Sequence, residues 1–140
     1  MIMQFRQHYS SSAGNLYTLD MIGERVLIDP GVSLEKIRQC GIAMAGATVW
    51  RSHEHQDHCA AYRHLVDRMA LPESSPWQTW GMQHDVECEA AMWVDSMESC
   101  LFAIDTGSFD SLPSIAATIF ALECNYQDEY LEQDLSLIHI

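Results

Sequence analysis

The pattern of apolar and polar residues near the start of the chain predicts three short strands. Apolar and polar residues alternate over residues 3–9, and two further short strands are predicted at 16–21 and 25–28. Because only Ile22-Gly23-Glu24 joins the last two runs, they predict a β-hairpin. A continuous apolar run over residues 45–50 is typical of a buried strand.

Two other stretches have the residue pattern of helices. Ser33 is a suitable N-cap for a helix that runs through residue 39, and Gly41 is suited to end that helix. Residues 60–69 place apolar side chains along one stripe at helical spacing. They predict a second helix.

The second half of the chain predicts mainly strands. The proline-containing segment 72–76 breaks the preceding helix, and Trp77 and Trp80 follow in what the pattern predicts to be a short connection. Strands are predicted at residues 90–94, 99–104 and 119–124, with a turn at 95–98.

A polar cluster follows directly after the apolar run at residues 45–50. His53, His55, Asp57 and His58 lie within six residues. Each polar group that loses water needs a partner, and imidazole and carboxylate groups are the usual ligands of zinc and similar divalent ions. In an extended segment alternate side chains share a face, so His53, His55 and Asp57 can lie together while His58 turns toward a second position. The alternatives are an exposed histidine-rich loop or an incidental metal-chelating tract.

Composition indicates one globular domain spanning residues 1–140, because 48% of its residues are apolar. No apolar run is long enough to cross a bilayer, and Arg6 and His8 stand where a signal peptide would be apolar, so we expect a cytoplasmic protein without a membrane partner. The five cysteines show no CxxC spacing, which argues against a disulfide framework or a cysteine zinc site.

The net charge of −13 bears on the substrate. Such a surface should repel a polyanion such as nucleic acid, which weighs against a nuclease. Divalent cations in a site would reverse the local field where a phosphate binds. Charge alone therefore leaves nucleic acid open as a substrate.

The HxHxDH pattern after an apolar strand resembles the signature of the metallo-β-lactamase-fold hydrolases. The resemblance covers about residues 3–131, and it is strongest toward the phage and bacterial exonuclease-like branch. It implies an α/β (α+β sandwich) architecture of the αββα type, with two sheets face to face and helices outside. The matching blocks outside the histidine motif are residues 10–17, 26–31, 83–88, 104–107 and 122–126.

The resemblance also implies a site with two divalent metal ions, Zn or Mn. Asp57 would in addition orient or deprotonate the attacking water as a catalytic residue. In the family Asp29 would support a metal-binding histidine, and a simple turn before Pro30 is the alternative; a turn-forming aspartate is likewise the alternative for Asp105. The implied ligands are His53, His55 and His84 for one ion, Asp57 and His58 for the second, and Asp105 as a bridge.

The implied function is a metal-dependent hydrolase that uses a metal-activated water. A phosphodiesterase or nuclease is the first hypothesis. A lactone or thioester hydrolase of the same fold is the alternative, and a metal-binding fragment without turnover is a third. The block that carries the family's last histidine is missing, and residues 134–140 resemble translated sequencing-adaptor sequence. We therefore expect a truncated gene product and do not assign His139 as a ligand.

Overall fold

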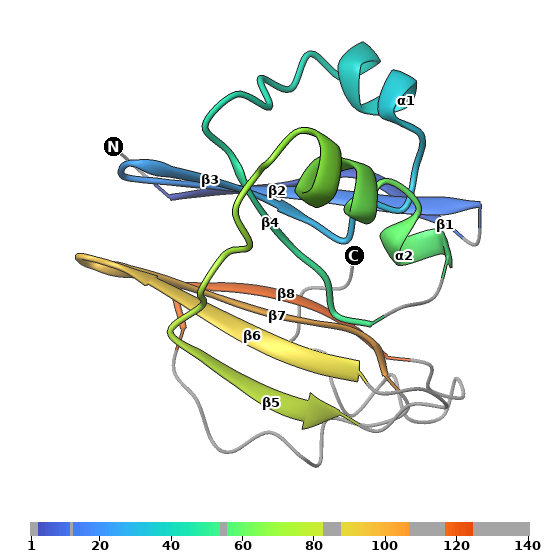
Figure 1. Ribbon diagram of the computed structural model, residues 1–140. Helices are drawn as coiled ribbons and strands as arrows, with labels where there is room; N and C mark the ends of the chain where they lie inside the picture. Colours follow the sequence, from blue (N-terminus) through green and yellow to red (C-terminus); the bar gives the residue numbers. More distant parts are fainter. Residues whose placement is uncertain (1–2, 12, 54–55, 83–87, 107–116, 125–140) are drawn as a thin grey trace. The chain divides into compact units, whose positions relative to one another are not determined.

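The computed structural model describes residues 3–11, 13–53, 56–82, 88–106 and 117–124. The chain divides into two compact units, Met1–Ser75 and Pro76–Ile140, and each contains one four-stranded sheet (Figure 1). Short helices accompany the first sheet. The protein is therefore a mixed α and β structure with two sheets.

The sheet of the first unit consists of β1 (Gln4–Ser11), β2 (Gly14–Met21), β3 (Glu24–Ile28) and β4 (Thr48–Trp50), in that order. Strands β1, β2 and β3 are antiparallel, and β4 runs parallel to β3. These strands confirm the predicted first strand, hairpin and buried strand. The parallel pairing is the feature that later matters for the site, because it brings the carboxyl ends of β3 and β4 to the same edge of the sheet.

Strand β4 is shorter than the apolar run at residues 45–50 predicts. Residues 45 and 46 form a turn, with Gly46 at a φ of +77° and the amide of Ala47 donating to the carbonyl of Met44 at 3.0 Å. Glycine adopts this left-handed conformation without steric cost, which allows a turn just before β4.

The first predicted helix is present as α1 (Leu34–Gln39). The hydroxyl of Ser33 accepts a hydrogen bond from the amide of Lys36 at 3.3 Å, and Gly41 follows the helix with a φ of +74°. Both end residues therefore act as their sequence positions predicted.

The second predicted helix, expected over residues 60–69, is present over residues 62–68 and follows a turn at residues 60 and 61. Helix α2 (Gln56–Cys59) begins inside the histidine motif, a turn follows, and a π-helical segment, η1 (His64–Arg68), comes after it. The amide of Ala61 donates to the carbonyl of Pro30 at 2.9 Å, so it is not available to continue α2. The amide of Met69 donates to the carbonyl of His64 at 3.1 Å, a five-residue step that makes η1 a π-helix.

One face of the first sheet packs against these helices. The strand residues Leu16, Leu27 and Val49 form one buried cluster with Ile37 of α1 and Leu65 of η1. Figure 1 shows α1 over this face of the sheet. The cluster fixes the helices to the strands whose ends carry the histidine motif.

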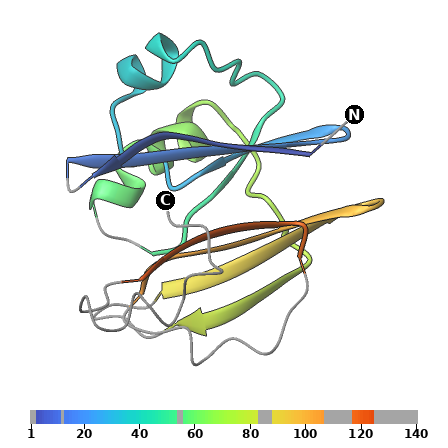
Figure 2. The same ribbon diagram turned by 180° about the vertical axis from the view of Figure 1, so that it is seen from behind.

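The second unit contains β5 (Gln78–Met82), β6 (Cys88–Asp95), β7 (Glu98–Thr106) and β8 (Ile119–Cys124), in that order. The first three are antiparallel and β8 is parallel to β7. Figure 2 shows β5 and β8 at opposite edges of this sheet. The three strands predicted here are confirmed, as is the turn at residues 95–98, where Asp95 pairs with Glu98.

Strand β5 was not predicted, since the sequence indicated only a connection around Trp77 and Trp80. Only Met82 of this strand is buried, and the other four residues are exposed or partly exposed. An edge strand without a buried face has no apolar alternation to reveal it.

Within the described ranges, no helix is long and apolar enough to span a membrane.

Candidate metal centre

The candidate site lies where β3 and β4 end. Asp29 follows the last residue of β3, and Ser52 and His53 lie shortly after β4. The amide of Asp29 donates to the carbonyl of Trp50 at 2.8 Å, which ties the two strand ends together. The end of an open parallel strand pair is where α/β proteins usually gather functional side chains.

Asp29 is the centre of a buried hydrogen-bond network. Its side chain is fully buried, and Oδ1 accepts from the Ser52 amide at 2.6 Å. Oδ2 accepts from the Ser52 hydroxyl at 2.7 Å and from Nδ1 of His58 at 2.8 Å. A simple turn at Asp29-Pro30-Gly31 would not need a buried carboxylate with three hydrogen-bond donors. The carboxylate instead orients Ser52 and His58.

Asp29 also has a left-handed backbone, with a φ of +49°. This conformation is unfavourable for most side chains, although aspartate and asparagine adopt it more readily than others. The surrounding hydrogen bonds compensate for it. The backbone turn therefore aims the carboxylate at the residues that follow β4.

The network determines which nitrogen of each imidazole offers a lone pair. Because the Ser52 hydroxyl donates to Asp29, it accepts at 2.8 Å from Nδ1 of His53. His58 likewise uses its Nδ1–H on the carboxylate. In the neutral form both rings therefore carry their lone pair on Nε2, which is the form that binds metals.

The two imidazoles lie close together and away from solvent. Their ring centroids are 4.3 Å apart, and each residue is only 3% exposed. One ligand atom from each of Asp29, His53 and His58 lies within 4.8 Å of the others. Since Oδ2 of Asp29 already accepts two hydrogen bonds, we assign Nε2 of each imidazole as the metal-binding atom and Asp29 as the orienting group. Imidazole nitrogens are ligands of zinc and of other first-row divalent ions.

Asn15 completes this cluster from β2. Its Nδ2 lies 3.1 Å from Nε2 of His58 and 3.2 Å from the carbonyl of Ser11, while its Oδ1 accepts from the Tyr17 hydroxyl at 3.3 Å. The last two bonds define the orientation of the amide, so its N–H points at the lone pair of His58. That is the same lone pair that a metal ion would use.

The structure brings together two of the six predicted ligands, His53 and His58. The other predicted positions stay predictions. His55 and His84 lie outside the described residues. Asp57 belongs to α2 and Asp105 to β7, but their side chains are outside the described part, so the catalytic role of Asp57 stays a prediction as well.

Ser52 and Asn15 were not predicted as site residues. Ser52 has no signal beyond its place directly before the histidine motif. Asn15 falls within the block 10–17 that resembles the family, and its contact with His58 joins residues 43 positions apart. Neither contact follows from local sequence.

No protein-family model and no curated protein sequence matches the chain. Among solved structures, the chain is similar to the crystal structure of the metallo-β-lactamase fold protein YhfI from Bacillus subtilis. The TM-score is 0.62 with 20% sequence identity, and the match covers 84% of this chain and 66% of that one. The chain has the metallo-β-lactamase fold, and the predicted fold class is confirmed. The exonuclease-like branch and the truncation stay predictions.

Proposed function

We propose that this protein is a metal-dependent hydrolase that uses a metal-activated water. The observation that carries the proposal is the buried network of Asp29, Ser52, His53 and His58 at the ends of two parallel strands. Burying four polar side chains is unfavourable unless they are satisfied, and an apolar strand end would be more stable. The metallo-β-lactamase fold supports a hydrolytic use of such a site.

The residues of the network have separate roles in this proposal. Asp29 holds the ring of His58, and Ser52 holds both Asp29 and the ring of His53, so both Nε2 atoms are positioned before any ion binds. Positioned ligands bind a metal more tightly because less freedom is lost on binding. A bound divalent ion would lower the pKa of a water toward neutrality and polarise the bond under attack.

The full proposed site extends beyond the described cluster. We include His55 and His84 with His53 for one ion, Asp57 with His58 for a second, and Asp105 between the ions. Asp57 would also orient the water or take its proton. These assignments derive from the family resemblance.

The favoured substrate is a phosphodiester. The sequence blocks that resemble the exonuclease-like branch support this choice, and bound cations would offset repulsion by the acidic chain. A lactone or thioester hydrolase is the second candidate, and the net charge of −13 favours it because such substrates are not polyanions.

The test is metal binding followed by turnover. Metal-free protein is loaded with zinc or manganese, the bound metal is measured by elemental analysis, and hydrolysis of bis-p-nitrophenyl phosphate, single-stranded DNA and a lactone is followed. We expect His58→Ala to lose bound metal and activity. His64→Ala is the matched control, because His64 is an exposed histidine of η1 outside the cluster.

Each outcome decides between the candidates. Metal bound equally by the His58→Ala and wild-type proteins would refute the site. Cleavage of the lactone alone would favour the second candidate. Bound metal without turnover of any substrate would favour a metal-binding protein that is not a hydrolase.

A further inference from the structure

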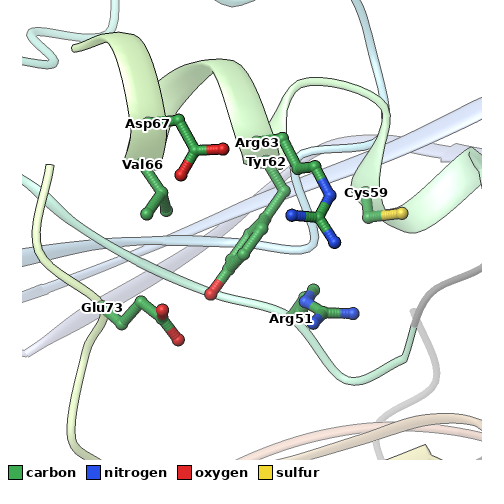
Figure 3. A pocket seen from close by; sticks show the side chains of 7 residues that line it. All are labelled: Arg51, Cys59, Tyr62, Arg63, Val66, Asp67 and Glu73. Carbon is green, nitrogen blue, oxygen red and sulfur yellow. The ribbon is translucent and has the colours of Figure 1, made fainter. Parts of the chain in front are cut away.

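A second feature of the first unit is a cavity of about 280 Å³ beside the histidine motif. Surveyed pockets for drug-sized ligands are larger, so this cavity suits one charged group with a small attached fragment. Its residues come from the end of β4, from α2 and η1, and from the segment after η1 (Figure 3). The lining residues are Arg51, Cys59, Tyr62, Arg63, Val66, Asp67 and Glu73.

The charged side chains are separated by the ring of Tyr62. Figure 3 shows the guanidinium groups of Arg51 and Arg63 on one side of this ring, toward Cys59, and the carboxylates of Asp67 and Glu73 on the other side. The pocket is therefore neutral in sum but has one basic side. That side is the one next to the histidine motif, since Cys59 directly follows His58.

Tyr62 keeps the two sides in place. Burial, followed by the hydrogen bond to the Glu73 carboxylate, raises the pKa of Tyr62 to about 12, so its hydroxyl stays protonated and donates to Glu73. The guanidinium carbon of Arg51 lies 4.8 Å from the centre of the Tyr62 ring. Glu73 is thus engaged by the tyrosine, and Arg51 is held over its ring.

Arg63 lines the cavity and differs from Arg25 in having no carboxylate partner among the described residues. Arg25 forms an ion pair with Asp20 at 2.7 Å. Across the described part of the chain, Arg63 makes no ion pair or hydrogen bond. Arg63 is exposed, and it lines the cavity together with Arg51, so its guanidinium is available to an external anion there.

We propose that the basic side of this cavity binds a phosphate group of the substrate, with Arg51 and Arg63 as its ligands. Two guanidinium forks match the oxygens of a phosphate, and Arg51 lies two residues before His53 in the chain. This subsite rests on the proposed hydrolase function and makes its substrate a phosphodiester with a neighbouring phosphate, as in a nucleotide chain.

The test measures binding without metal, so that it does not depend on turnover. Metal-free protein is titrated with thymidine 5′-monophosphate and with thymidine, and binding is followed by calorimetry. We expect only the monophosphate to bind, and Arg63→Gln to weaken it at least tenfold. Arg68→Gln is the matched control, because Arg68 is an exposed arginine of η1 that does not line the cavity.

One further variant and one competing ligand keep the test decisive. Glu73→Gln removes a negative charge from the far side of the ring, so the monophosphate should bind more tightly. Succinate should compete poorly if the site selects phosphate. Equal binding of thymidine and its monophosphate, no binding of either by folded protein, or equal weakening by Arg63→Gln and Arg68→Gln would each overturn the subsite.

Failure of the subsite can be distinguished from failure of the proposed function. Metal-dependent cleavage of bis-p-nitrophenyl phosphate by a protein that does not bind the monophosphate would leave the hydrolase and remove the subsite. Arg63-dependent binding of the monophosphate by a protein that binds no metal would leave a phosphate site and remove the hydrolase.

Discussion

The two units of the protein differ in what they bury. Seven polar side chains are buried among the described residues, and all of them belong to the first unit. In the second unit the buried described residues are apolar or cysteine, and seven of them form one cluster across β5, β6, β7 and β8. The buried polar residues are Asn15, Thr18, Asp29, Ser52, His53, His58 and Ser74.

This difference indicates that the described part of the second unit has an ordinary stabilising core, whereas the first unit contains the candidate site. An apolar cluster stabilises by about 25 cal/mol for each Å² removed from water, whereas a buried polar group stabilises only when its partners are in place. The described part of the second unit therefore follows the ordinary rule for a core. The first unit departs from that rule at the ends of β3 and β4, where the hydrogen bonds converge on Asp29.

The largest expected effect is that of replacing Asp29 with alanine. This change leaves the amide and hydroxyl of Ser52 and Nδ1 of His58 without their acceptor in a buried place. We expect a loss of about 3–5 kcal/mol in the free energy of unfolding, measured by urea denaturation, together with loss of bound metal.

Asp29→Asn separates the two losses. Asparagine tolerates the left-handed backbone and keeps the shape of the side chain, so the loss in stability should be smaller. Its N–H₂ group would face Nδ1 of His58 and favour the tautomer with the proton on Nε2. Metal binding should then fall as far as in Asp29→Ala. An asparagine variant that keeps its metal would show that Asp29 has only a structural role.

The counterpart in the second unit is Leu101→Ala. Leu101 is 3% exposed and belongs to the apolar cluster of that unit. We expect a loss of about 3 kcal/mol in the free energy of unfolding from the cavity that remains. The folded protein should still bind as much metal to the His53–His58 cluster as the wild type, measured by elemental analysis. A parallel loss of metal would contradict the separation of roles.

The sequence predicted those parts of the fold that have an apolar face. Strands β2, β3, β6 and β7 bury alternate or continuous apolar side chains, and the pattern reveals them. Strand β5 has Gly81 and exposed polar residues instead, so it carries no such signal. The interruption between α2 and η1 depends on the bond from Ala61 to the carbonyl of Pro30, a contact that no local pattern encodes.

The site was predictable to the extent that its residues are close in sequence. His53 and His58 stand out by their spacing, and the structure places them together. Nothing in the local sequence distinguishes Ser52, and it contacts Asp29 because β3 and β4 pair in parallel. Its role depends on the strand topology, which local sequence patterns do not predict.

Ser52→Ala should have a smaller effect than the changes at Asp29. The variant loses the hydroxyl that bridges Asp29 and His53, but the Ser52 amide still donates to the carboxylate. We expect a loss of about 1–2 kcal/mol in the free energy of unfolding and a 10- to 100-fold weaker metal affinity. Calorimetric titration with zinc checks the affinity, and Ser74→Ala, a buried serine bonded to Glu24, is the matched control.

The smallest effect is on cysteine reactivity, and it compares the two units directly. Cys40 and Cys59 in the first unit are partly exposed, whereas Cys88 and Cys100 in the second are buried. Burial raises the pKa of Cys100 from 9.0 to about 12, so at pH 8 it has about a thousandfold less thiolate than an exposed cysteine, and thiolate is the reactive form.

Alkylation of native protein with iodoacetamide, mapped by mass spectrometry, should therefore label Cys40 and Cys59 well before Cys100. At pH 9 Cys100 should still be labelled slowly, because its thiolate stays a minor form until the pH approaches 12. Denatured protein, in which all thiols should react alike, is the control. Early labelling of Cys100 in folded protein would show that the second unit opens locally. It would contradict the conclusion that this unit has a well-packed core.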